Sequence, residues 1–407
     1  MEQGLRHYFI VTGCYWAFTL TDGAIRMLVI LYFHLLGYSP FEVAMLFLFY
    51  EFFGIVTNLV GGWLGSRIGL NITMHIGMAL QVFALAMLMV PDVWLSVAYV
   101  MLAQALSGIA KDLNKMSAKA SVKALIPNQD SGSRLFKWIS VLTGSKNALK
   151  GVGFFLGAWL LQHFEFRGAL AILSGGLLLV LLASLTMLPA GLGKSESKPK
   201  FTQVFSKSAA INWLSAARFF LFGSRDIWFV VALPVYLYSV LQWSFMQVGS
   251  FLAIWIIGYG IVQASAPRLL KKRHHGKGPN GNTAKWLAFL LALIPAAIAA
   301  GLYSNVWPQY VLILGLIIFG IIFAINSAVH SYLIVAWSAH DAVSMNVGFY
   351  YMANAGGRLT GTVLSGWIYQ TLGLTGCLIA SSLFVFLTWI LSFRLHHANQ
   401  ASQMKPT

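Results

Sequence analysis

The chain has 407 residues, of which 58% are hydrophobic and only 9% are charged, and its formal net charge is +16. Soluble domains carry roughly 25% charged residues, so this composition excludes an ordinary soluble protein and indicates a helical protein that crosses a membrane several times. The positive charge does not indicate a nucleic-acid-binding protein, because it lies in short loops between apolar segments and inside those segments.

Twelve apolar segments have the length of a membrane-spanning helix, which needs about 20 residues. They lie at about 8–36, 41–65, 72–90, 94–124, 135–162, 168–189, 209–241, 246–267, 285–304, 309–336, 345–372 and 374–394. The first lacks the cleavage site of a signal peptide, so we expect it to remain as a span. Segment 191–207 is polar and is predicted to link an N-terminal six-helix bundle (1–190) to a C-terminal one (208–407).

Lysine and arginine residues between the spans predict the orientation, because they favour the cytoplasmic side. With both termini in the cytoplasm, eighteen of them are cytoplasmic and only Arg167 lies in an outer loop, while the other eight of the 27 fall inside the spans. We therefore expect both termini to be cytoplasmic in a multi-pass plasma-membrane protein.

The two halves of the chain repeat each other. The motif Lys-x2-Gly-x5-Trp-x2-Gln at 150–162 matches Arg-x2-Gly-x5-Trp-x2-Gln at 358–370, which lies 208 residues later. Two parallel copies of six helices are typical of the major facilitator architecture, in which the substrate site is near the midplane between the halves. The repeat places Lys150 and Arg358 at equivalent positions of the fifth and eleventh spans.

Basic residues outnumber acidic residues inside the predicted spans by about four. The basic residues are Arg26, Lys111, Lys115, Lys146, Lys150, Arg218, Arg225 and Arg358, and the acidic residues are Asp22, Glu51, Asp112 and Asp226. A lysine at bilayer depth costs roughly 3 kcal/mol unless it has a partner. An anionic substrate would neutralise the surplus, so we predict substrate binding by seven residues: Lys111, Lys115, Lys146, Lys150, Arg218, Arg225 and Arg358.

Structural ion pairing is the competing interpretation of these charges. Asp22 and Arg26 are four residues apart, Asp112 and Lys115 are three apart, and Asp226 follows Arg225 directly. These residues are predicted to form ion pairs or to couple transport to protons. No acid is near Lys150 or Arg358 in the sequence, so we expect these two to bind substrate. Arginine grips a phosphate or carboxylate with a planar fork, which favours Arg358 and Arg218 as the clamps.

Other polar residues inside the spans are interpreted as structural. Asn326 and His330 share a helix face, where a histidine is more often packed and hydrogen-bonded than a proton carrier. Lys119 and Lys123 continue the spacing of Lys111 and Lys115, either as side chains that reach the inner lipid surface or as a funnel for anions. The only cysteines, Cys14 and Cys377, lie near opposite chain ends, so neither a disulfide nor a soft-metal site is expected.

Nothing in the sequence indicates an enzyme. It has no nucleophile elbow, no phosphate-binding P-loop and no zinc-protease motif, so we expect no catalytic residues, no metal and no cofactor. A drug/proton antiporter would need surplus acid at the midplane, whereas the surplus here is basic. A membrane-embedded enzyme or a receptor would need a catalytic cluster at the membrane surface or a sizeable domain outside the membrane, and the longest loops are under about 25 residues.

Six stretches resemble the ArsJ family of organoarsenical efflux permeases, a branch of the major facilitator superfamily. They are TDGAIRMLVI (21–30), LFYEFFGIVTNLVGGWLG (48–65), ALSGIAKDLNKMSAKASVK (105–123), TGSKNALKGVGFFLG (143–157), LSAARFFLFGSRDIWFVVALPVYL (214–237) and YYMANAGGRLTGTVLSGW (350–367). The similarity extends over nearly the whole chain. The lysine-bearing stretches are specific to that family.

The resemblance implies export of 1-arseno-3-phosphoglycerate across a bacterial inner membrane, and hence resistance to arsenate. It implies functional coupling to a cytoplasmic glyceraldehyde-3-phosphate dehydrogenase that makes this ester, and release of arsenate outside. Export or exchange of another phosphorylated organic anion is the alternative. Apart from the anionic substrate and the lipid bilayer we expect no further partner, and we expect a monomer. Whether protons are coupled through Asp22 or Asp226 stays open, because the membrane potential alone favours export of an anion.

Overall fold

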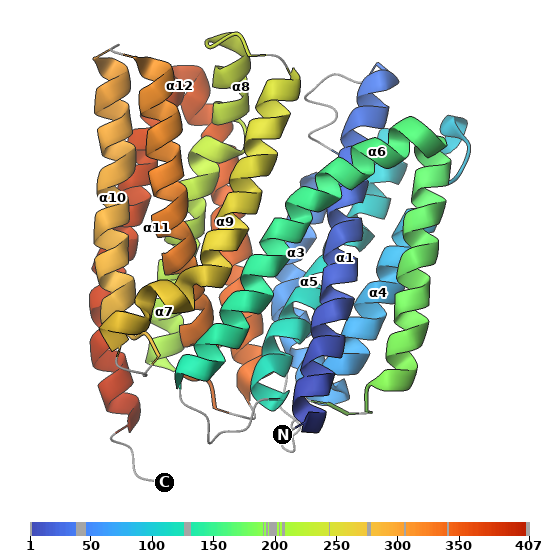
Figure 1. Ribbon diagram of the computed structural model, residues 1–407, viewed down its shortest axis with the longest axis horizontal. Helices are drawn as coiled ribbons and strands as arrows, with labels where there is room; N and C mark the ends of the chain where they lie inside the picture. Colours follow the sequence, from blue (N-terminus) through green and yellow to red (C-terminus); the bar gives the residue numbers. More distant parts are fainter. Residues whose placement is uncertain are drawn as a thin grey trace. The chain divides into compact units, whose positions relative to one another are not determined.

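The computed structural model describes residues 2–37, 46–125, 132–189, 208–243, 245–274, 278–304, 307–339 and 342–403, with a few positions between 191 and 205. Every regular element in these ranges is helical (Figure 1). The elements are α1 (Glu2–Leu35), α3 (Leu48–Ile68), α4 (Leu70–Met87), the 3-10 turn η1 (Asp92–Trp94), α5 (Val97–Leu125), α6 (Gly132–Met187), α7 (Ala209–Phe229), α8 (Ala232–Ser239), α9 (Phe245–His274), α10 (Gly281–Tyr303), α11 (Pro308–Ala336) and α12 (Val343–Gln403).

Long apolar helices dominate the described part of the chain. Seven helical stretches within it are long and apolar enough to cross a membrane, and two of these, in α6 and α12, run over 53 residues each. A bilayer core about 30 Å thick is spanned by roughly 20 helical residues, so each of these two stretches has the length of two spans. The prediction of an all-α, multi-pass membrane fold is confirmed. The count of twelve spans and the cytoplasmic position of both termini remain predictions.

The breaks inside α6 and α12 repeat the internal symmetry of the sequence. Each helix contains one residue with a left-handed backbone, Glu165 (φ 57°) in α6 and Gly373 (φ 64°) in α12. These two residues are 208 positions apart, which is the offset of the sequence motif. Both fall between predicted spans. Each long helix is therefore two helices joined at a single residue.

The two breaks differ in strain, because only glycine adopts a left-handed backbone without a steric penalty. We expect Glu165→Gly to stabilise the protein by about 1 kcal/mol and Gly373→Ala to destabilise it by about 1 kcal/mol. A methyl group on Gly175, within α6, would meet no atom within 4 Å, so Gly175→Ala serves as the control and should be neutral or stabilising. Thermal unfolding of the purified variants measures all three. An unchanged or raised melting temperature for Gly373→Ala would contradict the argument.

The predicted span 209–241 is divided into α7 and α8 in the structure. Pro234 lies in the first turn of α8. In a continuous helix its ring would clash with the carbonyl group four residues earlier, and its nitrogen has no hydrogen to donate. The helix therefore breaks at Val230 and Val231. Ser365 of α12 accepts a hydrogen bond from the backbone nitrogen of Ala232 at 3.1 Å and so satisfies one of the groups that the break exposes.

The chain forms two compact units, each with its own apolar core. Unit 1 comprises 1–130, 145–205 and 339–352, and unit 2 comprises 131–144, 206–338 and 353–407. The unit 1 core includes Leu28, Phe33 and Leu85, and the unit 2 core includes Trp228 and Phe319. The proposed division of the chain into 1–190 and 208–407 at a linker stays a prediction.

Candidate substrate-binding site

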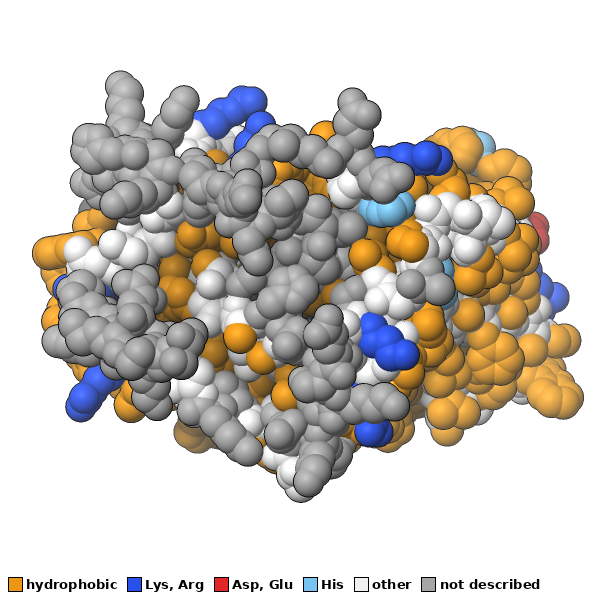
Figure 2. Space-filling view, turned by 90° about the horizontal axis from the view of Figure 1, so that it is seen from below, with side chains coloured by type: hydrophobic (Ala, Val, Ile, Leu, Met, Phe, Trp, Pro, Cys, Tyr) orange, Lys and Arg blue, Asp and Glu red, His pale blue; other side chains and the backbone are white. Residues whose placement is uncertain are grey.

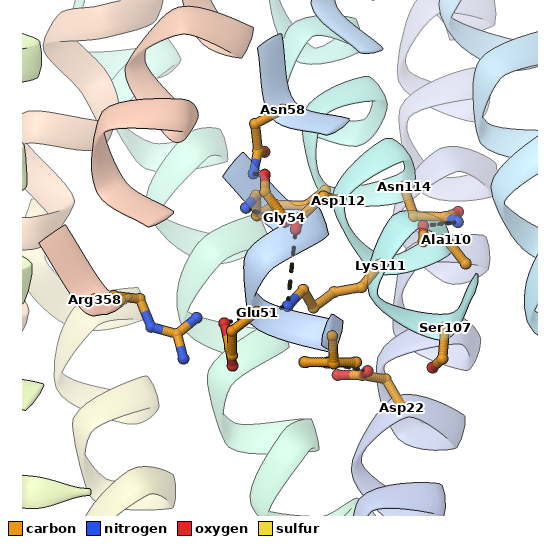
Figure 3. A network of polar contacts seen from close by, with 12 residues as sticks. Asp22, Glu51, Gly54, Asn58, Ser107, Ala110, Lys111, Asp112, Asn114 and Arg358 are labelled. Atoms are coloured by element: carbon orange, nitrogen blue, oxygen red, sulfur yellow. Dashed lines mark hydrogen bonds and ion pairs between the residues drawn. The ribbon is translucent and has the colours of Figure 1, made fainter. Parts of the chain in front are cut away.

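A chain of alternating charges crosses three helices of unit 1. Arg26 of α1 lies 3.3 Å from Glu51 of α3, and Lys111 of α5 lies 3.8 Å from both Glu51 and Asp112. Lys115 completes the chain by pairing with Asp112 one turn away. Figure 3 shows Glu51, Lys111 and Asp112 close together between α3 and α5. Two carboxylates are thus shared by three cations.

Aromatic rings extend the same cluster. The Lys111 ammonium lies 3.7 Å from the ring centre of Tyr50, and the Arg26 guanidinium lies 5.2 Å from it. The Lys115 ammonium lies 4.4 Å from the ring of Tyr351. Such cation–π contacts lower the free energy of a partly desolvated cation. The sequence analysis did not assign Tyr50 or Tyr351 to the site. The only signal in the sequence was the position of Tyr50, directly before Glu51.

A second pair in unit 1 joins α1 to α6. The Lys150 ammonium lies 3.7 Å from the carboxylate of Asp22, which also accepts a hydrogen bond from the Tyr50 hydroxyl. Asp22 is only 3% exposed. The two helices come this close because they cross at glycines: a methyl group on Gly23 would lie 2.7 Å from the Lys150 carbonyl oxygen, and one on Gly153 would lie 2.7 Å from that of Leu20.

Unit 2 contains the equivalent pair between α7 and α12. Arg358 donates a hydrogen bond of 3.0 Å to one carboxylate oxygen of Asp226, and Arg225 donates one of 2.7 Å to the other. Asp226 is fully buried. A methyl group on Gly361 would lie 2.5 Å from the carbonyl oxygen of Gly223, so a glycine contact again brings the helices together.

The repeated motif therefore has a structural meaning. In each unit, a base on the fifth helix of the repeat stands three residues before a glycine that packs on the first helix, and an aspartate of that first helix holds the base. Lys150 and Arg358 are 208 residues apart, and Asp22 and Asp226 are 204 residues apart. Each unit therefore contains one copy of the same ion pair between equivalent helices.

Arg218 is held by neutral groups as well as by packing. Its guanidinium donates to the Asn354 side chain at 2.8 Å and to the Ser327 hydroxyl at 3.1 Å, and it lies 3.7 Å from the centre of the Phe222 ring. Gln263 donates to the same Ser327 hydroxyl at 3.1 Å. Asn354, Ser327 and Gln263 were missed in the sequence, where polar residues inside a span give no indication of their partner.

Both units carry more cations than carboxylates inside the predicted spans. Unit 1 has five cations and three carboxylates, and unit 2 has three cations and one carboxylate, so each unit has a formal surplus of two. A carboxylate shared between two cations neutralises only one of them. Sharing a carboxylate in this way holds two cations in place on one buried acid.

The sequence and the fold both match a known family. A model of the major facilitator superfamily matches residues 11–328, which is more than half of the chain. The chain belongs to the major facilitator superfamily. Members of this superfamily are membrane transporters, and a transport function is supported for this chain.

Solved structures of other transporters share its fold. They include the human organic anion transporter MFSD10 (17% identity, TM-score 0.75, 96% of this chain and 99% of that one) and the E. coli fucose:proton symporter FucP (12%, 0.75, 96% and 99%). A bacterial homologue of the iron transporter ferroportin is similar as well (16%, 0.74, 95% and 99%). Identities this low show the fold alone. No curated protein matches the sequence.

Two expectations about charge pairing in this transporter are corrected by the structure. Lys150 and Arg358 have no acid nearby in the sequence and were therefore not expected to form structural ion pairs, but Asp22 and Asp226 pair with them from other helices. Arg26 was expected to pair with Asp22 on its own helix, but it pairs with Glu51 of α3. In both cases the partner lies on another helix and is supplied by helix packing.

Other expectations hold, fail or stay open. The predicted pairs Asp112–Lys115 and Asp226–Arg225 are confirmed. Lys146 donates to the Asn147 side chain at 3.3 Å. Lys119 is only 2% exposed, so the interpretation that its side chain reaches the lipid surface is wrong, whereas the side chain of Lys123 lies outside the described residues. Substrate binding by the seven predicted cations remains a prediction.

Asn326 and His330 of α11 are packed, as predicted, and both are fully buried. The expected hydrogen bonds are not found: neither side chain has a hydrogen-bond partner among the described residues. We assign them no role in the site. Among the described residues, no group of three or more metal-binding side chains is present.

Proposed function

We propose that this transporter exports an organic anion from the cytoplasm by alternating access, and that the anion is 1-arseno-3-phosphoglycerate. The observation that carries the proposal is the repeated aspartate–cation pair, Asp22–Lys150 and Asp226–Arg358, in units that each have a surplus of cations. A substrate with an anionic group at each end matches an arrangement in which each unit supplies a cation, Lys150 in unit 1 and Arg358 in unit 2. Export of this ester would confer resistance to arsenate in the inner membrane of a bacterium.

In the absence of substrate, the carboxylates of Asp22 and Asp226 occupy the cations that would bind the substrate's anionic groups. Each buried carboxylate neutralises a partly buried cation, and an unpaired charge there would cost several kcal/mol. An oxyanion of the substrate competes with the carboxylate for the same cation, and Arg358 offers it a planar fork of donors. Because the cation is already positioned by the glycine contact, little conformational entropy is lost when the anion binds.

The cysteine content supports an oxyanion rather than trivalent arsenic. Trivalent arsenic is a soft ion that would call for a cluster of thiolates. Cys14 and Cys377 are both buried and free, and they belong to different units. A fold shared with an organic anion transporter, MFSD10, is compatible with the proposal and adds nothing about the substrate.

The membrane potential supplies a driving force. Moving one negative charge out of a cell with 100 mV inside negative is favourable by about 2.3 kcal/mol. A substrate with two or three negative charges therefore gains about 5–7 kcal/mol, and its breakdown outside prevents return. Coupling to protons through Asp22 or Asp226 is not required by this energy balance.

The proposal is tested by uptake of the arsenylated ester into inverted membrane vesicles. Vesicles that contain the transporter should accumulate arsenic only when a glyceraldehyde-3-phosphate dehydrogenase and its substrates are present to make the ester. Clamping the potential with potassium and valinomycin should change the rate, whereas collapsing the pH gradient alone should not. Uptake of inorganic arsenate without the dehydrogenase, or no uptake with it, would contradict the proposed substrate. Uptake of other phosphorylated anions at an equal rate would favour the broader exporter.

A further inference from the structure

A cluster of aromatic and basic side chains lies at the end of unit 2 where α7 and α10 begin and α12 ends, the lower end in Figure 1. The start of α10 and the end of α12 lie side by side: a methyl group on Gly281 of α10 would lie 2.9 Å from the Leu395 side chain of α12. Thr388 of α12 likewise donates to a carbonyl oxygen of α7, that of Ala217, at 3.4 Å.

Two cations of this cluster lie over aromatic rings. The Lys285 ammonium is 4.8 Å from the centre of the Phe393 ring and 5.8 Å from that of Trp286. The Arg394 guanidinium is 5.8 Å from the centre of the Trp213 ring. Trp286 is 54% exposed and Phe393 is 46% exposed, so the rings present their surfaces to the surroundings.

From Lys285 towards the middle of the helices, aromatic rings of α10 and α12 continue in contact with one another. Phe393 contacts Trp389 at 5.1 Å between ring centres, and Trp389 contacts both Phe289 and Phe386 at 5.4 and 5.2 Å. This strip is apolar, and Lys285 lies over Phe393 at one end of it. Its shape and polarity therefore match a lipid, with a charged head group at the helix ends and an acyl chain along the rings.

The charge of the adjacent sequence segments favours an anionic head group. Residues 268–285 contain six basic residues and no acidic one, and residues 394–407 contain two basic residues and no acidic one. Figure 2, which views the molecule from this end, shows lysine and arginine side chains among the described residues. Clusters of four to eight basic residues next to a membrane helix attract anionic lipids, by about 1 kcal/mol for each cation.

We infer that Lys285 and Arg394, with the aromatic strip of α10 and α12, bind the phosphate head group and one acyl chain of an anionic phospholipid. The phosphate accepts from the ammonium and guanidinium groups, and the chain packs on Phe289, Trp389 and Phe386. This site is separate from the ion pairs of the candidate substrate site, and the inference does not rest on the proposed function.

The test measures binding of dioleoyl-phosphatidylglycerol and dioleoyl-phosphatidylcholine to the purified full-length protein by native mass spectrometry. The double variant Lys285→Gln/Arg394→Gln should bind phosphatidylglycerol about 25-fold more weakly, about fivefold for each cation, and phosphatidylcholine equally well. Arg67→Gln is the matched control, because Arg67 of unit 1 also lies over a tryptophan ring, 5.2 Å from the centre of Trp63. The control should keep wild-type binding.

A second variant separates loss of charge from loss of folding. Lys285→Arg/Arg394→Lys keeps both charges and should bind phosphatidylglycerol as the wild type does. The inference is overturned if the glutamine variant binds phosphatidylglycerol normally, if Arg67→Gln weakens binding equally, or if the charge-retaining variant loses binding too. Displacement of the lipid by millimolar inorganic phosphate would show a free-anion site, and displacement on dimerisation would show a protein interface; either result also overturns it.

Discussion

If Lys150 binds substrate as proposed, transport is expected to be lost when Lys150 and Asp22 are neutralised together, although the protein stays folded. Lys150→Ala alone leaves the buried Asp22 carboxylate without its cation, which should cost about 3–5 kcal/mol of stability. Asp22→Asn/Lys150→Gln removes both charges, and the asparagine oxygen still accepts from Tyr50. The double variant should therefore recover most of the stability and none of the transport, because the cation proposed to bind substrate is absent.

The measurements are melting temperature in detergent and arsenate resistance in cells that also make the dehydrogenase. The control is Asp92→Asn/Arg167→Gln, which removes an exposed ion pair of 3.1 Å whose two side chains are about half exposed. Exposed pairs contribute about 0–1 kcal/mol, so this variant should be stable and active. Near-normal resistance in the Asp22→Asn/Lys150→Gln variant would refute a substrate role for Lys150.

Gly361→Ala is expected to disrupt the second ion pair without touching a charged residue. The added methyl group would lie 2.5 Å from the Gly223 carbonyl oxygen and 3.0 Å from the Asp226 Cβ atom, so α12 must move away from α7. Overpacking of this kind costs about 1–3 kcal/mol. The shift also separates Arg358 from Asp226, and we expect the rate of transport to fall at least tenfold at equal protein level.

Gly366→Ala is the matched control on the same helix. A methyl group there would meet no atom within 4 Å, so the change should be neutral or slightly stabilising and should leave transport intact. Vesicle uptake and melting temperature measure both variants. If Gly361→Ala transports as well as Gly366→Ala, the glycine contact does not position Arg358.

Local sequence patterns were sufficient for the features that depend on neighbouring residues. The break between spans at Glu165 and at Gly373 falls between predicted segments, because each apolar segment ends once it has crossed the hydrocarbon layer. The pair Asp112–Lys115 was predicted for a similar reason, since helix geometry brings residues three positions apart onto one face.

Pairing between helices was beyond local patterns. The sequence repeat identified Lys150 and Arg358 as equivalent, but it did not reveal that each has an aspartate partner. Spacing along one helix likewise assigned Arg26 to Asp22, whereas the structure assigns it to Glu51. Helix periodicity predicts which face of a helix a side chain lies on, but it does not predict which other helix packs against that face.

From the sequence alone came the membrane class, the two copies of the motif and the eight basic residues inside the spans, because composition and repeats are properties of the chain itself. Tertiary structure alone decided how those charges are compensated. The deciding contacts are close approaches at Gly153 and Gly361, where the absence of a side chain lets two backbones meet and brings a carboxylate to a base more than a hundred residues away.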